Sequence, residues 1–305
     1  MPPTIDGATA LVGVLGDPVG HSLSPAMHNA ALAELGLNWA YLALPTPAAE
    51  LAAVLRALEA LDCRGLNVTL PHKQAAAELA DALSPLARRL GAVNTLVRRA
   101  EGGWMGTNTD VEGFLAPLRD GNGPAPWRGQ RALVLGCGGS ARAVVAGCAE
   151  LDLERISVAG RRAASLEPFI ESCRPWAPGI EALAWDDSDD PGDGPLSSAV
   201  AQADLVVNTT PLGMAAAEDP AAAQRCPLTP GQLDRLRPGV VVYDLIYTPR
   251  PTRLLREAAA RGGRGLDGLE MLVQQGAAAL RLWSGLQQVP VETMRRAALD
   301  RLEGP

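Results

Sequence analysis

Residues 131–142 read RALVLGCGGSAR, a stretch in which a short apolar run leads directly into a glycine-rich turn. The turn fits the pattern G-x-G-x-x-A, with Gly136, Gly138 and Ala141 at the marked positions. The glycines permit a close backbone approach, so a pyrophosphate can rest on the amides that open the next helix. An ordinary strand–helix turn is the alternative, but the flanking runs favour a dinucleotide site. The residues predicted to bind cofactor phosphates are Gly136, Cys137, Gly138, Gly139 and Ser140.

The type of cofactor is indicated at the end of the next predicted strand, Ile156–Ala159. An NAD site would place Asp or Glu there to bind the ribose 2′-hydroxyl. The sequence instead continues with Gly160, Arg161 and Arg162, and no acid is present. A guanidinium matches a phosphate in charge and geometry, whereas two solvated arginines on a turn are the alternative. These residues predict NADP rather than NAD.

Short β-type runs alternate with Ala- and Leu-rich helical runs along most of the 305-residue chain. This alternation is typical of βαβ units, and the length suggests two domains, so we predict an α/β fold with mainly parallel sheets. The predicted strands are Ala10–Leu15, Trp39–Leu44, Cys63–Thr69, Thr95–Arg99, Ala132–Leu135, Ile156–Ala159, Leu205–Asn208 and Val240–Asp244. The predicted helices include Ala48–Ala60, Ala141–Leu151, Arg253–Arg261 and a helical region over Met271–Leu302.

Two stretches rich in turn-forming residues interrupt this alternation. The first, Asp120–Pro126, precedes the glycine-rich motif and is a candidate domain boundary. The second, Asp186–Pro195, is acidic and is expected to form a surface loop.

Composition excludes several classes of function. The net charge of −7, the pI of about 5.1 and the scattered basic residues argue against a nucleic-acid partner. The five cysteines form no C-x-x-C pair, and with three histidines no zinc spacing appears, so we expect reduced thiols and no metal site. Because neither a signal peptide nor a membrane span is visible, we expect a cytoplasmic protein without membrane contacts.

Polar residues gather where predicted strands end, which is where parallel sheets bind ligands. The stretch Asn67–Lys73 ends a strand with polar groups and places Lys73 in the first turn of a helix, the unfavourable end for a cation. Ser24, before Pro25, has the pattern of a helix N-cap, whereas Ser22 has no such structural reason. Asn94 and Asp110 follow two further apolar runs. Together these groups suit a small substrate with several hydroxyls and a carboxylate.

Lys73 and Asp110 are the candidate proton-handling pair. Hydride transfer from a secondary alcohol needs a base for the hydroxyl proton, and the reverse reaction needs an acid. A solvated surface lysine is the alternative for Lys73, and the unfavourable helix end argues against it.

Eight motifs in order resemble the shikimate dehydrogenase family, and the resemblance extends over nearly the whole chain. The matching stretches are Ser22–Pro25, Asn67–Lys73, Gly91–Thr95, Gly106–Asp110, Gly136–Ser140, Asn208–Met214, Tyr243–Tyr247 and Asp267–Leu272. The resemblance implies reversible, NADPH-dependent reduction of 3-dehydroshikimate to shikimate, a step in aromatic amino acid biosynthesis.

The resemblance also implies roles for individual residues. Ser22 and Ser24 would hold the substrate carboxylate, and Lys73 and Asp110 would act at the reacting hydroxyl. Other substrate ligands would be Thr69, Asn94, Gln275 and, nearby, Tyr247. Around the cofactor, Arg161 and Arg162 would bind the 2′-phosphate, and Leu245 and Gly268 would border the nicotinamide.

Family architecture implies two α/β domains with a cleft between them. Residues 1–110 would form the substrate-binding and catalytic domain, completed by C-terminal helices over 270–305, and residues 111–269 the Rossmann-like NADP-binding domain. A homodimer and a monomer are both compatible with the resemblance. The sequence departs from the family at Gly160–Arg162, where many relatives have Asn-Arg-Thr, and at Glu270, where a glycine is common.

Two other functions remain open from the sequence. A quinate/shikimate dehydrogenase has a similar pattern and often accepts NAD, but both serines are present and no acid occurs at 159–162. A non-catalytic NADP-binding regulator could share the fold, and the retention of both Lys73 and Asp110 argues against it.

Overall fold

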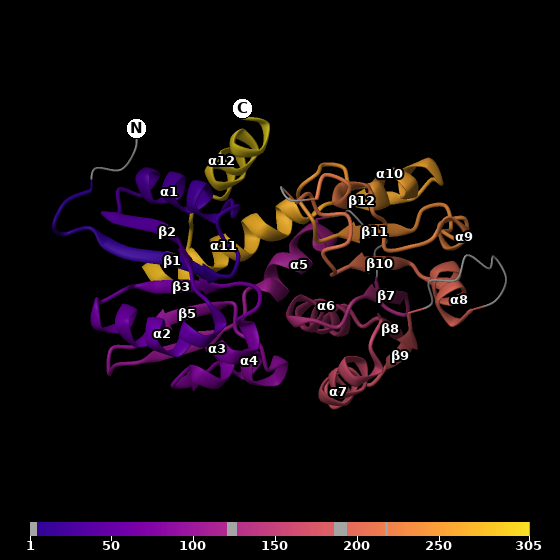
Figure 1. Ribbon diagram of the computed structural model, residues 1–305, viewed down its shortest axis with the longest axis horizontal. Coiled ribbons are helices and arrows are strands. Elements are labelled where there is room, and N and C mark those ends of the chain that lie inside the picture. Colours follow the sequence, from indigo (N-terminus) through magenta and orange to yellow (C-terminus); the bar gives the residue numbers. More distant parts are fainter. Residues whose placement is uncertain (1–4, 121–126, 186–193, 217–218, 305) are drawn as a thin grey trace. The chain divides into compact units, whose positions relative to one another are not determined.

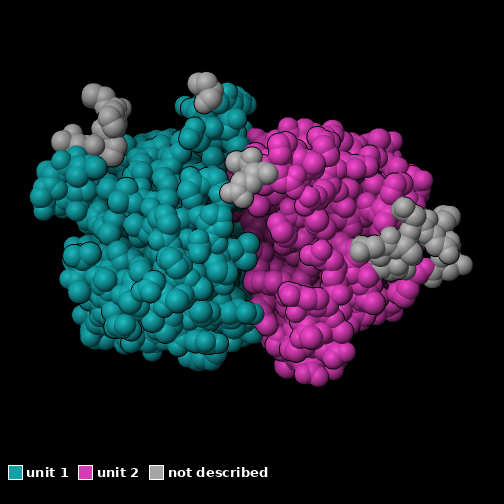
Figure 2. Space-filling model, viewed as in Figure 1, with its two compact units in different colours: residues 1–113, 272–305 teal, residues 114–271 magenta. Residues whose placement is uncertain are grey.

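The computed structural model describes residues 5–120, 127–185, 194–216 and 219–304 (Figure 1). The chain divides into two compact units, which Figure 2 colours separately. Unit 1 comprises residues 1–113 and 272–305, and unit 2 comprises residues 114–271. The division falls inside a helix, Asp110–Arg119, rather than at the candidate boundary Asp120–Pro126, of which residues 121–126 lie outside the described part.

Within the described residues, unit 1 contains a six-stranded sheet in the order β2-β1-β3-β5-β6-β4. Its strands are β1 (Ala10–Gly16), β2 (Trp39–Pro45), β3 (Gly65–Val68), β4 (Ala82–Leu83), β5 (Thr95–Arg98) and β6 (Trp104–Thr107). Only β5, among these six described strands, runs against the others, pairing antiparallel with β3 and β6. The amino end of β5 therefore lies at the same sheet edge as the carboxyl ends of its neighbours.

Helices cover the unit 1 sheet and bury its apolar residues. They are α1 (Ser24–Glu34), α2 (Leu51–Ala60), which follows a 3₁₀ turn at Ala48–Glu50, α3 (Lys73–Leu79), α4 (Pro85–Leu90) and α12 (Val291–Glu303). Helix α5 (Asp110–Arg119) leads out of unit 1, and α11 (Gly268–Ser284) leads back into it. Leu51, Leu55 and Leu58 of α2 fall on one face at helical spacing and pack into a core with Leu66 and Leu96 of the sheet.

Within the described residues, unit 2 has a fully parallel six-stranded sheet in the order β12-β11-β10-β7-β8-β9. Its strands are β7 (Arg131–Leu135), β8 (Arg155–Gly160), β9 (Ile180–Ala184), β10 (Leu205–Asn208), β11 (Val241–Asp244) and β12 (Arg264–Leu266). Its helices are α6 (Gly139–Glu150), α7 (Ala163–Cys173), α8 (Pro195–Gln202), α9 (Pro230–Leu233) and α10 (Arg253–Ala260), with a 3₁₀ turn at Ala222–Gln224. This strand order is that of the Rossmann fold, in which ligands bind where the order reverses, between β7 and β10.

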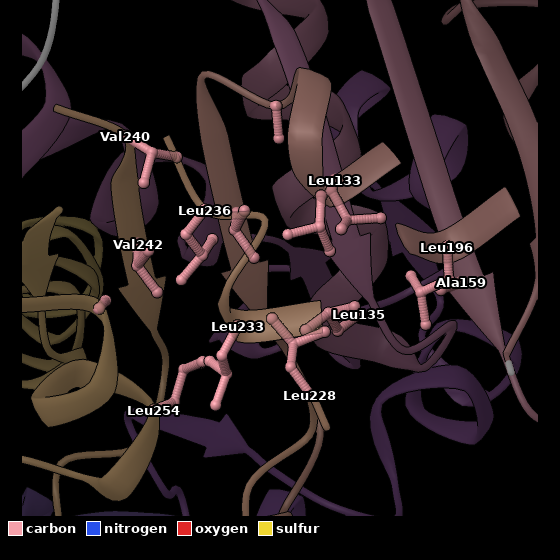
Figure 3. Packing of buried hydrophobic residues seen from close by; sticks show 14 of the residues in the cluster. Leu133, Leu135, Ala159, Leu196, Leu228, Leu233, Leu236, Val240, Val242 and Leu254 are labelled. Atoms are coloured by element: carbon pink, nitrogen blue, oxygen red, sulfur yellow. The ribbon is translucent and has the colours of Figure 1, made fainter. Parts of the chain in front are cut away.

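The strands of unit 2 are buried on both faces, which explains their nearly continuous apolar sequences. Figure 3 shows Leu133 and Leu135 of β7 and Val242 of β11 in one core with Leu196 of α8 and Leu254 of α10. The predicted α/β class and its Rossmann-like part are confirmed. The strands β4, β6, β9 and β12 were not among the predicted strands, because runs of two to five residues are too short to show a clear period.

Two other predicted segments, the strand Cys63–Thr69 and the acidic loop Asp186–Pro195, have different bounds in the structure or lie partly outside its described residues. The expected strand Cys63–Thr69 is shorter, because Cys63 and Thr69 lie outside β3. Residues 186–193 of the expected acidic loop lie outside the described part, and Pro195 begins α8. In the part that the structure describes, no helix is both long and apolar enough to cross a bilayer, and no cluster of acidic, His and Cys side chains is arranged to hold a metal.

Candidate active site

Lys73 and Asp110 meet in unit 1, as the sequence predicts. Lys73 Nζ lies 2.7 Å from Asp110 Oδ2, and both residues are buried, with 8% and 5% exposure. Lys73 is the first residue of α3, whose start is held in place by a 2.7 Å contact between His72 Nε2 and the Thr46 carbonyl. Asp110 is the first residue of α5, where the helix macrodipole favours its negative charge. The ion pair thus compensates the unfavourable placement of the ammonium.

Asn94 orients the carboxylate of Asp110 from the other side. Its Nδ2 donates to Asp110 Oδ1 at 2.8 Å, while its Oδ1 accepts from the Thr109 amide at 2.7 Å. The sequence places Asn94 after an apolar run, but the structure places it immediately before β5. Asn94 reaches the edge where β3 and β6 end because β5 is antiparallel to them.

Gln275 joins the same group from a distant part of the sequence. Asn94 Nδ2 donates to Gln275 Oε1 at 3.3 Å, and Gln275 Nε2 donates to the Leu272 carbonyl at 2.9 Å. The side-chain amide of Gln275 is therefore fixed by its own helix, α11, as it faces the pair. Thr69 lies half-buried directly after β3 and donates its amide to the Leu15 carbonyl at 2.9 Å.

The structure reverses the local structural roles that the sequence suggested for the two serines at the start of α1. Ser24 was predicted to cap α1, but it is the first residue of the helix, and no side chain makes a capping hydrogen bond there. Instead, Ser22 Oγ accepts from the Ser24 amide at 3.2 Å. Ser22 thus has the local structural role, and the buried hydroxyl of Ser24 is not used as a cap. The error arose because Pro25 occupies the second helical position rather than the first.

Three buried polar residues of this network were not singled out as functional from the sequence. Thr95 Oγ1 contacts Asn94 Oδ1 and Thr109 Oγ1 at 3.0 and 3.1 Å, and Asn108 Oδ1 accepts from the Asp110 amide at 3.0 Å. Two of them, Asn108 and Thr109, had a signal in the sequence, since they are consecutive polar residues between a strand and Asp110. Another sequence feature was also overlooked, because Lys73 is the only lysine among the 27 Lys and Arg residues.

In unit 2, the glycine-rich loop has the shape that a pyrophosphate site needs. Gly136 adopts φ +106°, and a side chain there would clash with Thr209. Gly138 is the N-cap of α6, provides no side-chain cap, and has open space where a Cβ would stand. The first amides of α6, from Gly139 and Ser140, are thus available to an anion that approaches the open side. These residues fit a dinucleotide phosphate.

The predicted 2′-phosphate residues follow β8 directly. Arg161 and Arg162 are both exposed, and Arg162 is the N-cap residue of α7. A Cβ on Gly160 would come within 3.3 Å of Cys137 Sγ, so this turn and the glycine-rich loop lie against each other. Burial raises the pKa of the Cys137 thiol, and the charges of Arg162 and Arg142 oppose that rise. The positive groups therefore lie beside the loop that would hold the phosphates.

Leu245 and Gly268, both predicted at the nicotinamide end, pack backbone to backbone. A Cβ on Gly268 would lie 2.0 Å from the Leu245 carbonyl oxygen, which excludes any other residue there without rearrangement. Glu270, a departure from the family pattern, occupies the first turn of α11, where a carboxylate complements the helix dipole. The remaining predicted substrate ligand, Tyr247, belongs to unit 2, where burial raises its pKa.

Comparison with known proteins identifies the family. Residues 14–96 match the "Shikimate dehydrogenase substrate binding domain" and residues 268–299 the "Shikimate 5'-dehydrogenase C-terminal domain". A "Shikimate dehydrogenase (NADP(+))" from Synechococcus sp. (strain JA-2-3B'a(2-13)) is 48% identical over 98% of this chain and 98% of its own length. The chain belongs to the shikimate dehydrogenase family. The resemblance predicted from the eight motifs is thereby confirmed.

Two solved structures of related enzymes have the same fold as this chain. Shikimate 5-dehydrogenase from Thermus thermophilus, in complex with NADP(H) and shikimate, superposes with a TM-score of 0.81 at 38% identity, covering 96% of this chain and 100% of that one. Quinate dehydrogenase from Corynebacterium glutamicum, in complex with NAD, gives a TM-score of 0.82 at 30% identity, covering 96% and 99%.

A buried carboxyl, Asp244, organises the loops after β10 and β11. It accepts hydrogen bonds from Thr252 Oγ1 at 2.7 Å, from Asn208 Nδ2 at 3.0 Å and from the Ile246 amide at 3.2 Å. Burial raises its pKa from 3.8 to about 6, although these hydrogen bonds oppose the rise. Because the native carboxyl holds its proton more tightly than the unfolded one, its contribution to stability is fully present below pH 3.8 and is lost as the pH rises through about 6.

We expect Asp244→Asn, which mimics the protonated carboxyl, to flatten this dependence. Between about pH 4 and about pH 7, the unfolding free energy of the wild type should fall by on the order of 2 kcal/mol more than that of the variant. Urea unfolding at both pH values measures the difference, and other titrating groups cancel between the two proteins. An identical pH dependence in both would contradict the raised pKa.

Proposed function

We propose that this chain catalyses the reversible NADPH-dependent reduction of 3-dehydroshikimate to shikimate, with Lys73 and Asp110 as the catalytic pair. It is an oxidoreductase of the shikimate pathway, which supplies aromatic amino acid biosynthesis. The observation that carries the assignment of roles is the buried 2.7 Å contact between Lys73 Nζ and Asp110 Oδ2 at the edge of the unit 1 sheet. Bound NADP supplies the hydride acceptor and NADPH the donor; the protein must handle the accompanying proton.

The proton is handled by an ammonium and a carboxylate already joined by a hydrogen bond. In the reduction direction the Lys73 ammonium gives a proton to the new alkoxide and is left as a neutral amine, and in the oxidation direction that amine takes the proton from the reacting hydroxyl. Asn94, bound to the second carboxylate oxygen, keeps Asp110 oriented toward Lys73 through both directions. Since Asp110 Oδ1 is occupied by this amide, Oδ2 and the lysine form the reactive side.

The remaining polar groups of unit 1 suit a small polyol acid. We assign Ser22 and Ser24 to the substrate carboxylate, since hydroxyls at the start of α1 can donate to an anion there. Ring hydroxyls are assigned to Thr69, Asn94 and Gln275, and Tyr247 of unit 2 is assigned to the substrate as well. Apart from Tyr247 these ligands all come from unit 1, and no role requires a second copy of the chain.

Cofactor binding is assigned to unit 2. Residues 136–140 would hold the pyrophosphate on the α6 amides. Arg161 and Arg162 would bind the 2′-phosphate, and Gly160 lies in the turn between these arginines and Cys137. Leu245 and Gly268 would border the nicotinamide. The five cysteines, all free thiols, fit a reducing compartment, and we propose that the enzyme acts in the cytoplasm.

A substrate and cofactor matrix tests this function against its alternatives. We expect purified protein to reduce NADP with shikimate, with kcat/KM at least about tenfold higher than with quinate or with NAD. The preference for NADP is expected because two arginines, and no acid, follow β8. The absorbance of the reduced cofactor, NADPH or NADH, gives all four rates. Equal turnover of quinate would indicate the broader quinate/shikimate enzyme, to which the fold is also similar, and no turnover with any pair would indicate a non-catalytic regulator.

Lys73→Ala should lower kcat roughly 10²- to 10⁴-fold while changing the KM for shikimate much less, because proton transfer matters mainly in the transition state. Lys73→Arg is the matched control, since it keeps the positive charge but cannot release a proton at working pH. We expect it to stay as inactive as the alanine variant in steady-state assays. Recovery of wild-type kcat with arginine would show that charge alone suffices and would remove the proton-transfer role.

Arg161→Ala should raise the KM for NADP roughly 10- to 100-fold and leave the KM for NAD nearly unchanged, because only NADP carries the phosphate that a charged hydrogen bond would hold. Arg155→Ala, at the opposite end of β8, is the control and should affect neither cofactor. An equal rise for NADP and NAD after the Arg161 substitution would withdraw the 2′-phosphate assignment.

A further inference from the structure

Asn208 and Asp244 form a buried pair where two neighbouring strands of the unit 2 sheet end. Asn208 is the last residue of β10 and Asp244 the last residue of β11, and both are fully buried. They lie opposite each other in the parallel register, and Asn208 Nδ2 donates to Asp244 Oδ1 at 3.0 Å. Neither residue is among the proposed ligands of substrate or cofactor. A buried carboxyl is costly, so the pair needs another explanation.

Asn208 uses its full hydrogen-bonding capacity to shape the loop after β10. Its Oδ1 accepts from the amide and from the hydroxyl of Thr210, at 3.0 and 2.7 Å. The second proton of its Nδ2 goes to the Leu212 carbonyl at 3.2 Å. The side chain that binds Asp244 is therefore itself held rigidly by its own loop.

Asp244 holds the loop after β11 through the same carboxylate oxygen. Besides the Asn208 amide, Oδ1 accepts from the backbone amide of Ile246 at 3.2 Å. The Ile246 carbonyl in turn accepts from the Gly268 amide at 3.1 Å, and a Cβ on Gly268 would lie only 2.0 Å from the Leu245 carbonyl oxygen. Asp244 Oδ1 thus connects, through Ile246, to both residues proposed to border the nicotinamide.

The pyrophosphate side of the cofactor site is fixed by separate contacts. The amide and the hydroxyl of Thr209 both donate to the Leu135 carbonyl, at 2.9 and 2.8 Å, and Gly136 follows directly. A Cβ on Gly136 would lie 2.6 Å from the Thr209 hydroxyl oxygen, so the glycine-rich loop rests against this threonine. Because neither contact involves Asp244, loss of its carboxyl should disturb the nicotinamide end and leave the phosphate end in place.

We propose that Asp244 is a positioning residue that, through Oδ1, sets the nicotinamide border of the cofactor site and joins it to the loop after β10. This inference rests on the proposed function, because it takes Leu245 and Gly268 as the residues beside the nicotinamide. The second oxygen has a different task, since Oδ2 accepts from Thr252 Oγ1 at 2.7 Å, at the start of α10. Variants that remove the contacts of one oxygen or the other can therefore separate positioning from stability.

Asp244→Ala tests the proposal with NADP⁺ and with 2′-phospho-ADP-ribose, which is NADP⁺ without its nicotinamide. We expect the Kd of NADP⁺, measured by calorimetry without substrate, to rise roughly tenfold, the effect of losing a buried hydrogen bond to a charged group. The Kd of 2′-phospho-ADP-ribose should rise less than about threefold, because its phosphate contacts do not depend on the carboxyl. A general loss of structure in unit 2 would instead weaken both ligands equally.

Two control variants keep the Oδ1 contacts. Asp244→Asn places its oxygen toward the two donors that face Oδ1, and it should bind both ligands within about threefold of wild type. Thr252→Val removes the bond to Oδ2 from an equally buried position, so it should lower the melting temperature and leave both Kd values unchanged. If Asp244→Ala does not fold, Asn208→Ser breaks the same bond from its other side, and the same difference between the two ligands is expected.

Three outcomes would overturn the inference and leave the proposed function standing. They are equal weakening of both ligands by Asp244→Ala, unchanged NADP⁺ affinity in that folded variant, and an Asp244→Asn variant that binds NADP⁺ as weakly as the alanine variant. A tenfold loss of NADP⁺ affinity in Thr252→Val would also overturn it, because that variant keeps both Oδ1 contacts. Wild-type protein that does not bind NADP⁺ would overturn the proposed function itself, and the inference with it.

Discussion

The buried pairing of an ammonium with a carboxylate is the interaction on which the rest of unit 1 depends. Lys73 starts a helix, where the macrodipole disfavours its charge, and burial removes most of its hydration. Asp110 compensates both costs, but only if its own carboxylate is fixed. Asn94 fixes it by donating a hydrogen bond to Asp110 Oδ1, and Asn108 by accepting one from the Asp110 backbone amide. A half-satisfied version of this network would be less stable than an apolar core, so its members depend on one another.

Strand direction makes this network possible. In a fully parallel sheet, Asn94, which precedes its strand, would stand at the opposite edge from Asp110, which follows one. The reversal of β5 brings the beginning of that strand level with the ends of β3 and β6. Unit 2 has the contrasting design, in which every described strand is parallel and the glycine-rich loop follows β7 beside the point where strand order reverses. Each unit thus collects its polar groups at one sheet edge by a different route.

The sequence allowed correct prediction of those features that depend on a short, local pattern of residues. The loop at 136–140 is readable because φ above zero and an open N-cap demand glycines in a fixed order, and the eight ordered motifs carried the family. Prediction failed where a contact depends on the exact residue at which a helix begins, or on a partner that is distant in sequence. The roles of Ser22 and Ser24 were reversed because a one-residue shift in the helix start changes which hydroxyl meets an amide. The buried hydrogen bond from the Tyr41 hydroxyl to Asn67 also gave no signal in the sequence, since in a strand an aromatic residue is ordinary and its partner is 26 positions away.

This chain has a single lysine, at position 73, and all of its other strongly basic side chains are arginines. Every other basic side chain, apart from the three histidines, is an arginine, so positive charge on the surface and in the proposed phosphate site is supplied by guanidinium groups throughout. A guanidinium holds its proton under all working conditions, whereas an amine can release and recover one. If position 73 needed only a cation to pair with Asp110, arginine would serve there as it does elsewhere, and its planar fork would bind the carboxylate with two hydrogen bonds. The single lysine therefore supports the proposal that position 73 supplies an exchangeable proton, which alcohol oxidation requires of the residue that faces the reacting hydroxyl.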